Sequence, residues 1–125
     1  MSGSILLAAT TIVFRGATLI DGTGAPAVPN ALLVVSEGRI VSAGPATPEA
    51  LAKLPADARV VDAAGKWIVP GLIDAHVHAE SDADLQTMLN WGITSVRLMA
   101  EDVAASQKLA AASRTRPSSP RPIRT

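Results

Sequence analysis

Residues 68–78 read Ile68-Val69-Pro70-Gly71-Leu72-Ile73-Asp74-Ala75-His76-Val77-His78 and carry the main structural signal of the sequence. It ends in His-x-His, and these two histidines are the only ones in the chain. Alternate residues of a β-strand point to the same face, so a strand here would direct both imidazoles to one side. Imidazoles placed in this way can converge on one metal ion, and a bound ion can activate water near neutral pH. We therefore predict His76 and His78 as the ligands of a metal site.

The same strand, predicted over residues 72–78, alternates between apolar and polar side chains. Ile73, Ala75 and Val77 form the expected apolar face. Asp74 shares the opposite face with the two histidines. It could accept a hydrogen bond from an imidazole N–H, although we favour a purely structural carboxylate. The competing interpretation of His-x-His is a pair of hydrogen-bonded rings with no metal.

A strand–helix–strand–helix order is predicted from this motif onward. Ser81-Asp82-Ala83-Asp84 has the pattern of a helix start with acidic residues at the positive end of the helix dipole. Gly92 indicates the end of that helix, residues 93–98 indicate the next strand, and residues 101–113 indicate an alanine-rich helix. This order predicts two parallel strands in a βαβ arrangement.

A structural interpretation is favoured for the other charged residues of this region. Arg97 could meet a substrate carboxylate, but we expect a surface or salt-bridge role. Carboxylates at helix starts are stabilised by the helix dipole without any catalytic role. This explanation is preferred to acid–base chemistry for Glu80, Asp82, Asp84, Glu101 and Asp102.

The sequence before the motif predicts a small β-rich segment. Apolar and β-branched runs indicate short strands, and a turn at residues 36–38 lets Gly38 adopt a positive φ. The strands are expected at residues 11–15, 17–20, 31–35, 39–42, 59–62 and 66–69, with a short helix over 48–54. The predicted domains are 1–69 (the β-rich segment), 70–113 (the βαβ segment) and 114–125 (a disordered tail with four arginines and no acid).

Composition narrows the range of functions. With 125 residues the chain is too short for a closed (β/α)8 barrel, which needs about 200 residues. The formal net charge is zero, which argues against nucleic acid or an anionic membrane surface as a partner. There is no cysteine, so disulfides and thiolate ligands are excluded. No apolar run approaches the ~20 residues of a transmembrane helix, and a cytoplasmic location is the default expectation.

These motifs resemble the N-terminal part of a metal-dependent amidohydrolase, most closely the imidazolonepropionase-like and prolidase-like branch of the superfamily. The family order is reproduced over about residues 11–113 by Asp21-Gly22-Thr23-Gly24, Glu37-Gly38-Arg39-Ile40, the His-x-His stretch and Trp91 to Arg97. The resemblance implies an α/β fold in which a partial (β/α)8 barrel, one or two β/α units long, follows part of a small β-sandwich.

The resemblance also implies a chemistry, namely hydrolysis of C–N bonds in small amide, cyclic amide or dipeptide-like substrates by metal-activated water. His76 and His78 would hold the ion, with zinc the first expectation and manganese, iron, nickel or cobalt as alternatives. The family's further histidines and its later lysine and aspartate have no counterpart here, and Arg97-Leu98-Met99 departs from the family's Arg-Asp-Met. We therefore expect a truncated chain that binds metal weakly and is inactive alone.

A different class of function stays open on the same sequence. The chain could be a non-catalytic binding or structural module, or a pseudogene-like remnant, that associates with itself or a partner through unpaired strand edges. The Arg-, Pro- and Ser-rich residues that follow Arg114 also fit an out-of-frame ending.

Overall fold

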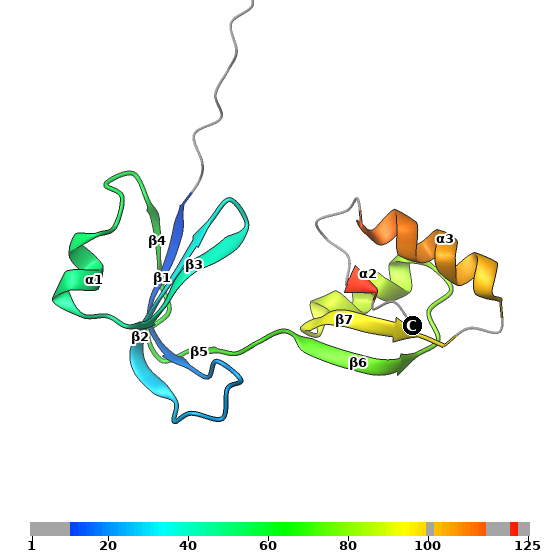
Figure 1. Ribbon diagram of the computed structural model, residues 1–125, viewed down its shortest axis with the longest axis horizontal. Helices are drawn as coiled ribbons and strands as arrows, with labels where there is room; N and C mark the ends of the chain where they lie inside the picture. Colours follow the sequence, from blue (N-terminus) through cyan, green and yellow to red (C-terminus); the bar gives the residue numbers. More distant parts are fainter. Residues whose placement is uncertain (1–10, 100–101, 115–120, 123–125) are drawn as a thin grey trace, which may run out of the picture. The chain divides into compact units, whose positions relative to one another are not determined.

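The computed structural model describes residues 11–99, 102–114 and 121–122. The architecture is mixed α/β, and the chain divides into two compact units, unit 1 (Met1–Pro70) and unit 2 (Gly71–Thr125). Figure 1 shows the elements of each unit. Across the described ranges, no helix has the length and apolar character that crossing a membrane requires.

Unit 1 is built on one five-stranded sheet in the order β3-β2-β1-β4, with β5 also paired to β1 (Figure 1). Strand β2 runs antiparallel to β1 and β3, whereas β4 and β5 run parallel to β1. Val13, Leu32 and Val34 form the buried core, and α1 packs Ala50 and Leu51 against it. The elements are β1 (Ile12–Leu19), β2 (Val28–Ser36), β3 (Arg39–Pro45), α1 (Pro48–Ala52), β4 (Arg59–Asp62) and β5 (Trp67–Ile68).

Strand β1 is continuous, although the sequence predicted two strands separated at Gly16. The register with β2 shifts between Arg15 and Ala17, so Gly16 is an extra residue in β1 and adopts a φ of +89°. A glycine reaches this backbone conformation without a Cβ penalty, which lets the strand continue through the bulge. The irregularity separates the two parallel partners of β1, because β4 pairs before Gly16 and β5 pairs after it.

The predicted hairpin turn between β2 and β3 is confirmed. Ser36 pairs with Arg39, which leaves a two-residue loop of Glu37 and Gly38. Both loop residues have positive φ, at +52° for Glu37 and +72° for Gly38. Two successive positive φ angles match the twist of a tight antiparallel hairpin.

Unit 2 contains parallel strands in the order β6-β7-β8, with a helix between successive strands (Figure 1). The parallel pairing that the sequence predicted for its first two strands is confirmed. The buried core consists of Val77, Ala79, Leu85 and Val96, and both helices pack partly buried side chains on it. The elements are β6 (Leu72–Val77), α2 (Asp82–Asn90), β7 (Ile93–Leu98), α3 (Val103–Arg114) and β8 (Arg121–Pro122).

Two expectations for unit 2 differ from the structure. The expected apolar face of the first strand is buried only at Val77, because Ile73 is 66% exposed and Ala75 is also exposed. The helix layer covers the carboxyl end of β6 and leaves its beginning open. Within the expected basic tail, Arg121 and Pro122 form β8 and pair with β7, and the helix before it reaches Arg114. The other residues of that tail lie outside the described ranges.

Candidate functional site

The two histidines meet at the carboxyl end of β6. His76 lies within the strand, and His78 is the first residue after it. Their Nε2 atoms are 3.2 Å apart, and the ring centroids are separated by 5.2 Å with 51° between the ring planes. Both side chains are exposed. The predicted convergence of the two imidazoles is therefore present in the structure.

The spacing of these nitrogens fits a single metal ion. Zinc binds imidazole nitrogen at about 2.0–2.1 Å in tetrahedral geometry, which places two ligand nitrogens about 3.3 Å apart. The observed Nε2 separation of 3.2 Å agrees with that value. The same distance also allows one neutral ring to donate a hydrogen bond to the other. In the described part of the chain, no group of three or more His, Cys, Asp or Glu residues could hold a metal ion.

An irregularity in the strand pairing lies directly at this site. Asp74 pairs with Val96, and the next pair joins Val77 to Leu98. Strand β6 therefore has two residues between these pairs, whereas β7 has one. Such bulges re-aim side chains and are frequent beside functional sites. The direction of the His76 side chain thus depends on the register between β6 and β7, as well as on the alternation of side chains along the strand.

Asp74 has the structural role that the sequence analysis favoured. Its Oδ1 accepts a hydrogen bond from the backbone N–H of His76 at 3.1 Å. The carboxylate thus contacts the backbone of a histidine and fixes the chain just before the two rings.

The predicted helix start after His78 is also confirmed. Ser81 is the N-cap of α2 and forms a capping box with Asp84. The hydroxyl of Ser81, followed by the backbone N–H groups of Glu80 and Ser81, holds the pKa of the Asp84 carboxyl below its ordinary value. Hydrogen bonds to the ionised form favour that form, so Asp84 is a carboxylate over the whole neutral range.

Among the residues that the structure describes, the remaining charged candidates form no metal-binding group with the histidines. The Asp102 carboxylate accepts hydrogen bonds from the N–H groups of Ala104 and Ala105, as a structural helix start requires. Asp82 lies in the first turn of α2, and Arg97 is exposed on β7. Glu101 lies outside the described ranges. Asp82 and Asp102 thus lie at helix starts, and Arg97 lies on the surface of a strand.

One close contact near the site was not anticipated. A Cβ on Gly71, just before β6, would overlap the side chain of Thr94 on β7. Thr94 is the extra residue of β7 where its register with β6 shifts between Leu72 and Ile73. The only signal in the sequence was a glycine directly before the strand, and its partner could be found only from the pairing register.

Comparison with known proteins finds relatives that are several times longer than this chain. No family model matches it. The 5-methylthioadenosine/S-adenosylhomocysteine deaminase of Symbiobacterium thermophilum is 34% identical over 103 residues, covering 74% of this chain and 23% of that protein. The imidazolonepropionase of a Methylobacterium species is 42% identical over 71 residues, covering 56% of this chain and 17% of that protein.

A solved structure agrees with these sequence relationships. A prolidase complexed with N-methylphosphonate-L-proline superposes with a TM-score of 0.67 at 28% identity, covering 90% of this chain and 31% of the prolidase. The chain thus spans less than a third of each of these proteins. From these similarities, this chain belongs to the amidohydrolase superfamily and corresponds to the N-terminal part of its members.

Proposed function

We propose that this chain carries part of the metal centre of a hydrolase that cleaves carbon–nitrogen bonds, with His76 and His78 as metal ligands. The observation that supports the proposal is the 3.2 Å separation of their Nε2 atoms. In this proposal unit 2 is the beginning of a (β/α)8 barrel, and unit 1 is part of a small β-sandwich. The parallel order β6-β7-β8 with intervening helices supports the barrel assignment.

The residues of this chain would bind and orient the ion. Neutral imidazole nitrogen suits zinc, and manganese, iron, nickel and cobalt also accept it. When bound, such an ion polarises a carbonyl oxygen and makes water a stronger nucleophile near neutral pH. Both histidine side chains are exposed, so an ion can enter from solvent. Asp74 would hold the backbone of the first ligand in place through its hydrogen bond to the His76 N–H.

The proposed substrates are small amides, cyclic amides or dipeptide-like molecules. Relatives named as an imidazolonepropionase and as a prolidase bound to a proline phosphonate support this class. We further propose that the 125-residue chain has no turnover alone. Two imidazoles leave the other positions of the ion to water, which makes the affinity weak and the catalytic set incomplete.

Zinc titration of the tag-free chain, followed by NMR of the histidine ring protons, tests the metal site. The chain has two histidines, so each ring signal is assigned by comparison with H76A and H78A. We expect both wild-type signals to shift with one common Kd, and either substitution to abolish this response. Zinc binding that persists in both single variants would overturn the ligand assignment.

An amide hydrolysis assay of the same sample with added zinc or manganese tests the proposal that the chain alone has no turnover. No turnover above the metal-only control is expected. Metal-dependent turnover that H76A abolishes would show that the chain is a complete catalyst, which contradicts the proposed inactivity and leaves the metal assignment intact.

A non-catalytic binding module is the second candidate, and the exposed apolar residues of β6 favour it. Leu72 is 57% exposed and Ile73 is 66% exposed. In the part of the chain that the structure describes, β6 pairs with β7 on one edge alone. A strand of this kind can add to another sheet. Strong association through β6, together with no zinc response in the wild-type chain, would favour this candidate.

A further inference from the structure

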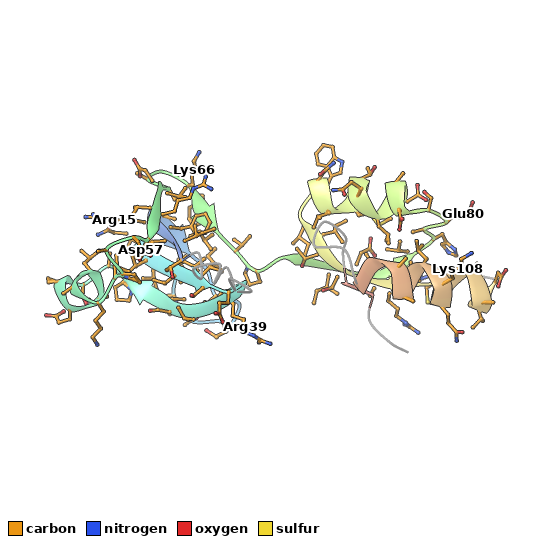
Figure 2. All side chains as sticks on the ribbon, turned by 90° about the horizontal axis from the view of Figure 1, so that it is seen from above. Arg15, Arg39, Asp57, Lys66, Glu80 and Lys108 are labelled. Carbon is orange, nitrogen blue, oxygen red and sulfur yellow. The ribbon has the colours of Figure 1, made fainter. Side chains whose placement is uncertain are left out.

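One carboxylate holds the loop that connects β6 to α2. Oδ2 of Asp84 accepts hydrogen bonds from the Glu80 N–H at 3.1 Å, the Ser81 N–H at 2.9 Å and the Ser81 hydroxyl at 2.8 Å. The Ser81 Oγ in turn accepts a bond from the Asp84 N–H at 3.3 Å. Figure 2 shows Glu80 in the loop that leads into α2. The backbone is therefore fixed two residues beyond His78.

The preceding residues are fixed by a different set of contacts. Val77 is 4% exposed, and its carbonyl accepts a hydrogen bond from the Met99 N–H at 2.8 Å. Ala79, on the other side of His78, is 7% exposed and belongs to the same core. His78 is thus an exposed residue between two buried ones, and Ala79 is the last core residue before the loop that Asp84 holds.

We infer that Asp84 is a positioning residue that holds the His78 ring against His76. Without its carboxylate, the N–H groups of Glu80 and Ser81 lose their acceptor, and the capping box of α2 loses its Asp84 half. The loop after Ala79 can then shift, which draws Ala79 from its place in the core and turns the backbone that carries the ring of His78. His76 is held separately, because its N–H binds Asp74. Removal of the Asp84 carboxylate therefore displaces one ring of the pair and leaves the other in place.

This inference rests on the proposed metal centre where it predicts a change in zinc affinity. Its direct test measures only the geometry of the two histidine rings. If the second imidazole is already in position before the ion binds, no conformational entropy is lost in ordering that side chain during binding. Contacts that orient metal ligands typically change affinity by about 10–100-fold when they are removed. Because Asp84 acts through the backbone, we expect the lower end, about tenfold.

The direct test needs no metal. It measures the nuclear Overhauser effect between the ring protons of the two histidines in the tag-free, zinc-free chain. The variants are D84A, the conservative D84N, and D102A as the matched control. Asp102 accepts hydrogen bonds from the N–H groups of Ala104 and Ala105 at the start of α3, so D102A removes a comparable contact from a different helix start.

We expect the ring–ring signal in the wild-type chain and in D102A, and its loss in D84A. D84N keeps an oxygen acceptor without the charge, so it should retain most of the signal. If D84A retains the wild-type signal while it is folded by circular dichroism, the inference is wrong. Equal losses in D84N and D84A would also overturn it, because charge rather than the hydrogen bonds would then orient the ring.

Zinc titration of the same samples separates this inference from the proposed function. We expect D84A to weaken the common Kd of the two histidine ring signals about tenfold. No zinc response in the wild-type chain, with the ring–ring signal present, refutes the metal centre alone. If D84A does not fold, S81A replaces it, because it removes one of the three donors to Asp84 and should reduce the ring–ring signal relative to D102A.

Discussion

Gly71 lies so close to Thr94 that no larger residue fits without movement of the backbone or of a neighbouring strand. A Cβ at this position would overlap three atoms of the Thr94 side chain, including its Cβ. Rotation of the threonine can move Oγ1 and Cγ2, but it cannot move the Cβ. The requirement for glycine here therefore comes from a close approach between β7 and the start of β6.

We predict that Gly71→Ala lowers the free energy of unfolding by about 1–3 kcal/mol, the usual cost of overpacking. Urea denaturation followed by circular dichroism measures the change. Thr94→Gly in the same background should recover part of the loss, because it removes every overlapping atom. Gly44→Ala is the matched control, since a Cβ there meets nothing within 4 Å. Equal stability of the two alanine variants would contradict the contact.

At the scale of elements, the cap of α2 should weaken in acid. Hydrogen bonds from Ser81 and Glu80 hold the pKa of Asp84 below its ordinary value of 3.8 in the folded state. A carboxyl with a depressed folded-state pKa stabilises the fold fully above its unfolded pKa. That stabilisation disappears as the pH falls through the lower folded-state pKa.

The difference in Tm between the wild-type chain and D84A should therefore be constant from about pH 7 to 5 and shrink below about pH 4. Thermal unfolding followed by circular dichroism across this range measures it. The other acidic residues are the same in both proteins, so their effect on Tm cancels in this difference. A difference that stays the same at pH 2.5 would show that ionisation of the Asp84 carboxyl does not stabilise the fold.

The free edge of β6 gives a second prediction at this scale. Ile73 is 66% exposed on a strand with one paired edge in the described ranges, so strand addition by a second copy is expected at high concentration. Ile73→Lys should lower the concentration-dependent mass measured by light scattering. Val103→Lys on α3 is the control, because Val103 is 64% exposed but lies on a helix. Equal effects would remove β6 as the associating edge.

Elements with a local signal could be predicted from the sequence. The hairpin at Glu37 and Gly38, the N-cap at Ser81 and the helix end before Gly92 each depend on a few neighbouring residues. The continuity of β1 through Gly16 could not be predicted, because a glycine inside a strand run indicates a break as readily as a bulge. That distinction depends on β2, β4 and β5, which are distant in sequence.

At the scale of the whole molecule, the two units have separate cores. Leu32 is 2% exposed in the core of unit 1, and Leu85 is fully buried in that of unit 2. Each unit also contains one of the two tryptophans, with Trp67 in β5 and Trp91 at the end of α2. The sequence therefore supplies one fluorescence probe for each unit.

We predict that Leu32→Ala and Leu85→Ala each destabilise their own unit by about 2–5 kcal/mol, the cost of truncating a buried leucine. W91F leaves Trp67 as the reporter of unit 1, and W67F leaves Trp91 as the reporter of unit 2. Denaturation followed by fluorescence should show a shifted midpoint only where the truncated leucine and the remaining tryptophan share a unit. Equal shifts at both reporters would show that the units unfold together.

Some features of the candidate site could be predicted from the sequence, and others could not. His76 and His78 could be paired from their spacing, and their rings do converge. The burial of the same strand could not be predicted, because Ile73 and Ala75 are exposed while Val77 is buried. The alternation of apolar and polar residues predicts which side chains share a face of the strand. Their burial depends on which distant elements cover that face. The metal ligation of the two histidines stays a prediction.

The extra residue between Asp74 and Val77 makes this short segment sensitive to length. A substitution at Ala75, which is exposed, changes one side chain and leaves the pairing intact. Deletion of Ala75 would instead let β6 pair regularly with β7 and turn the residues on one side of the deletion to the opposite face. Functional variants of this segment should therefore tolerate substitution of Ala75 but not a change in the number of residues.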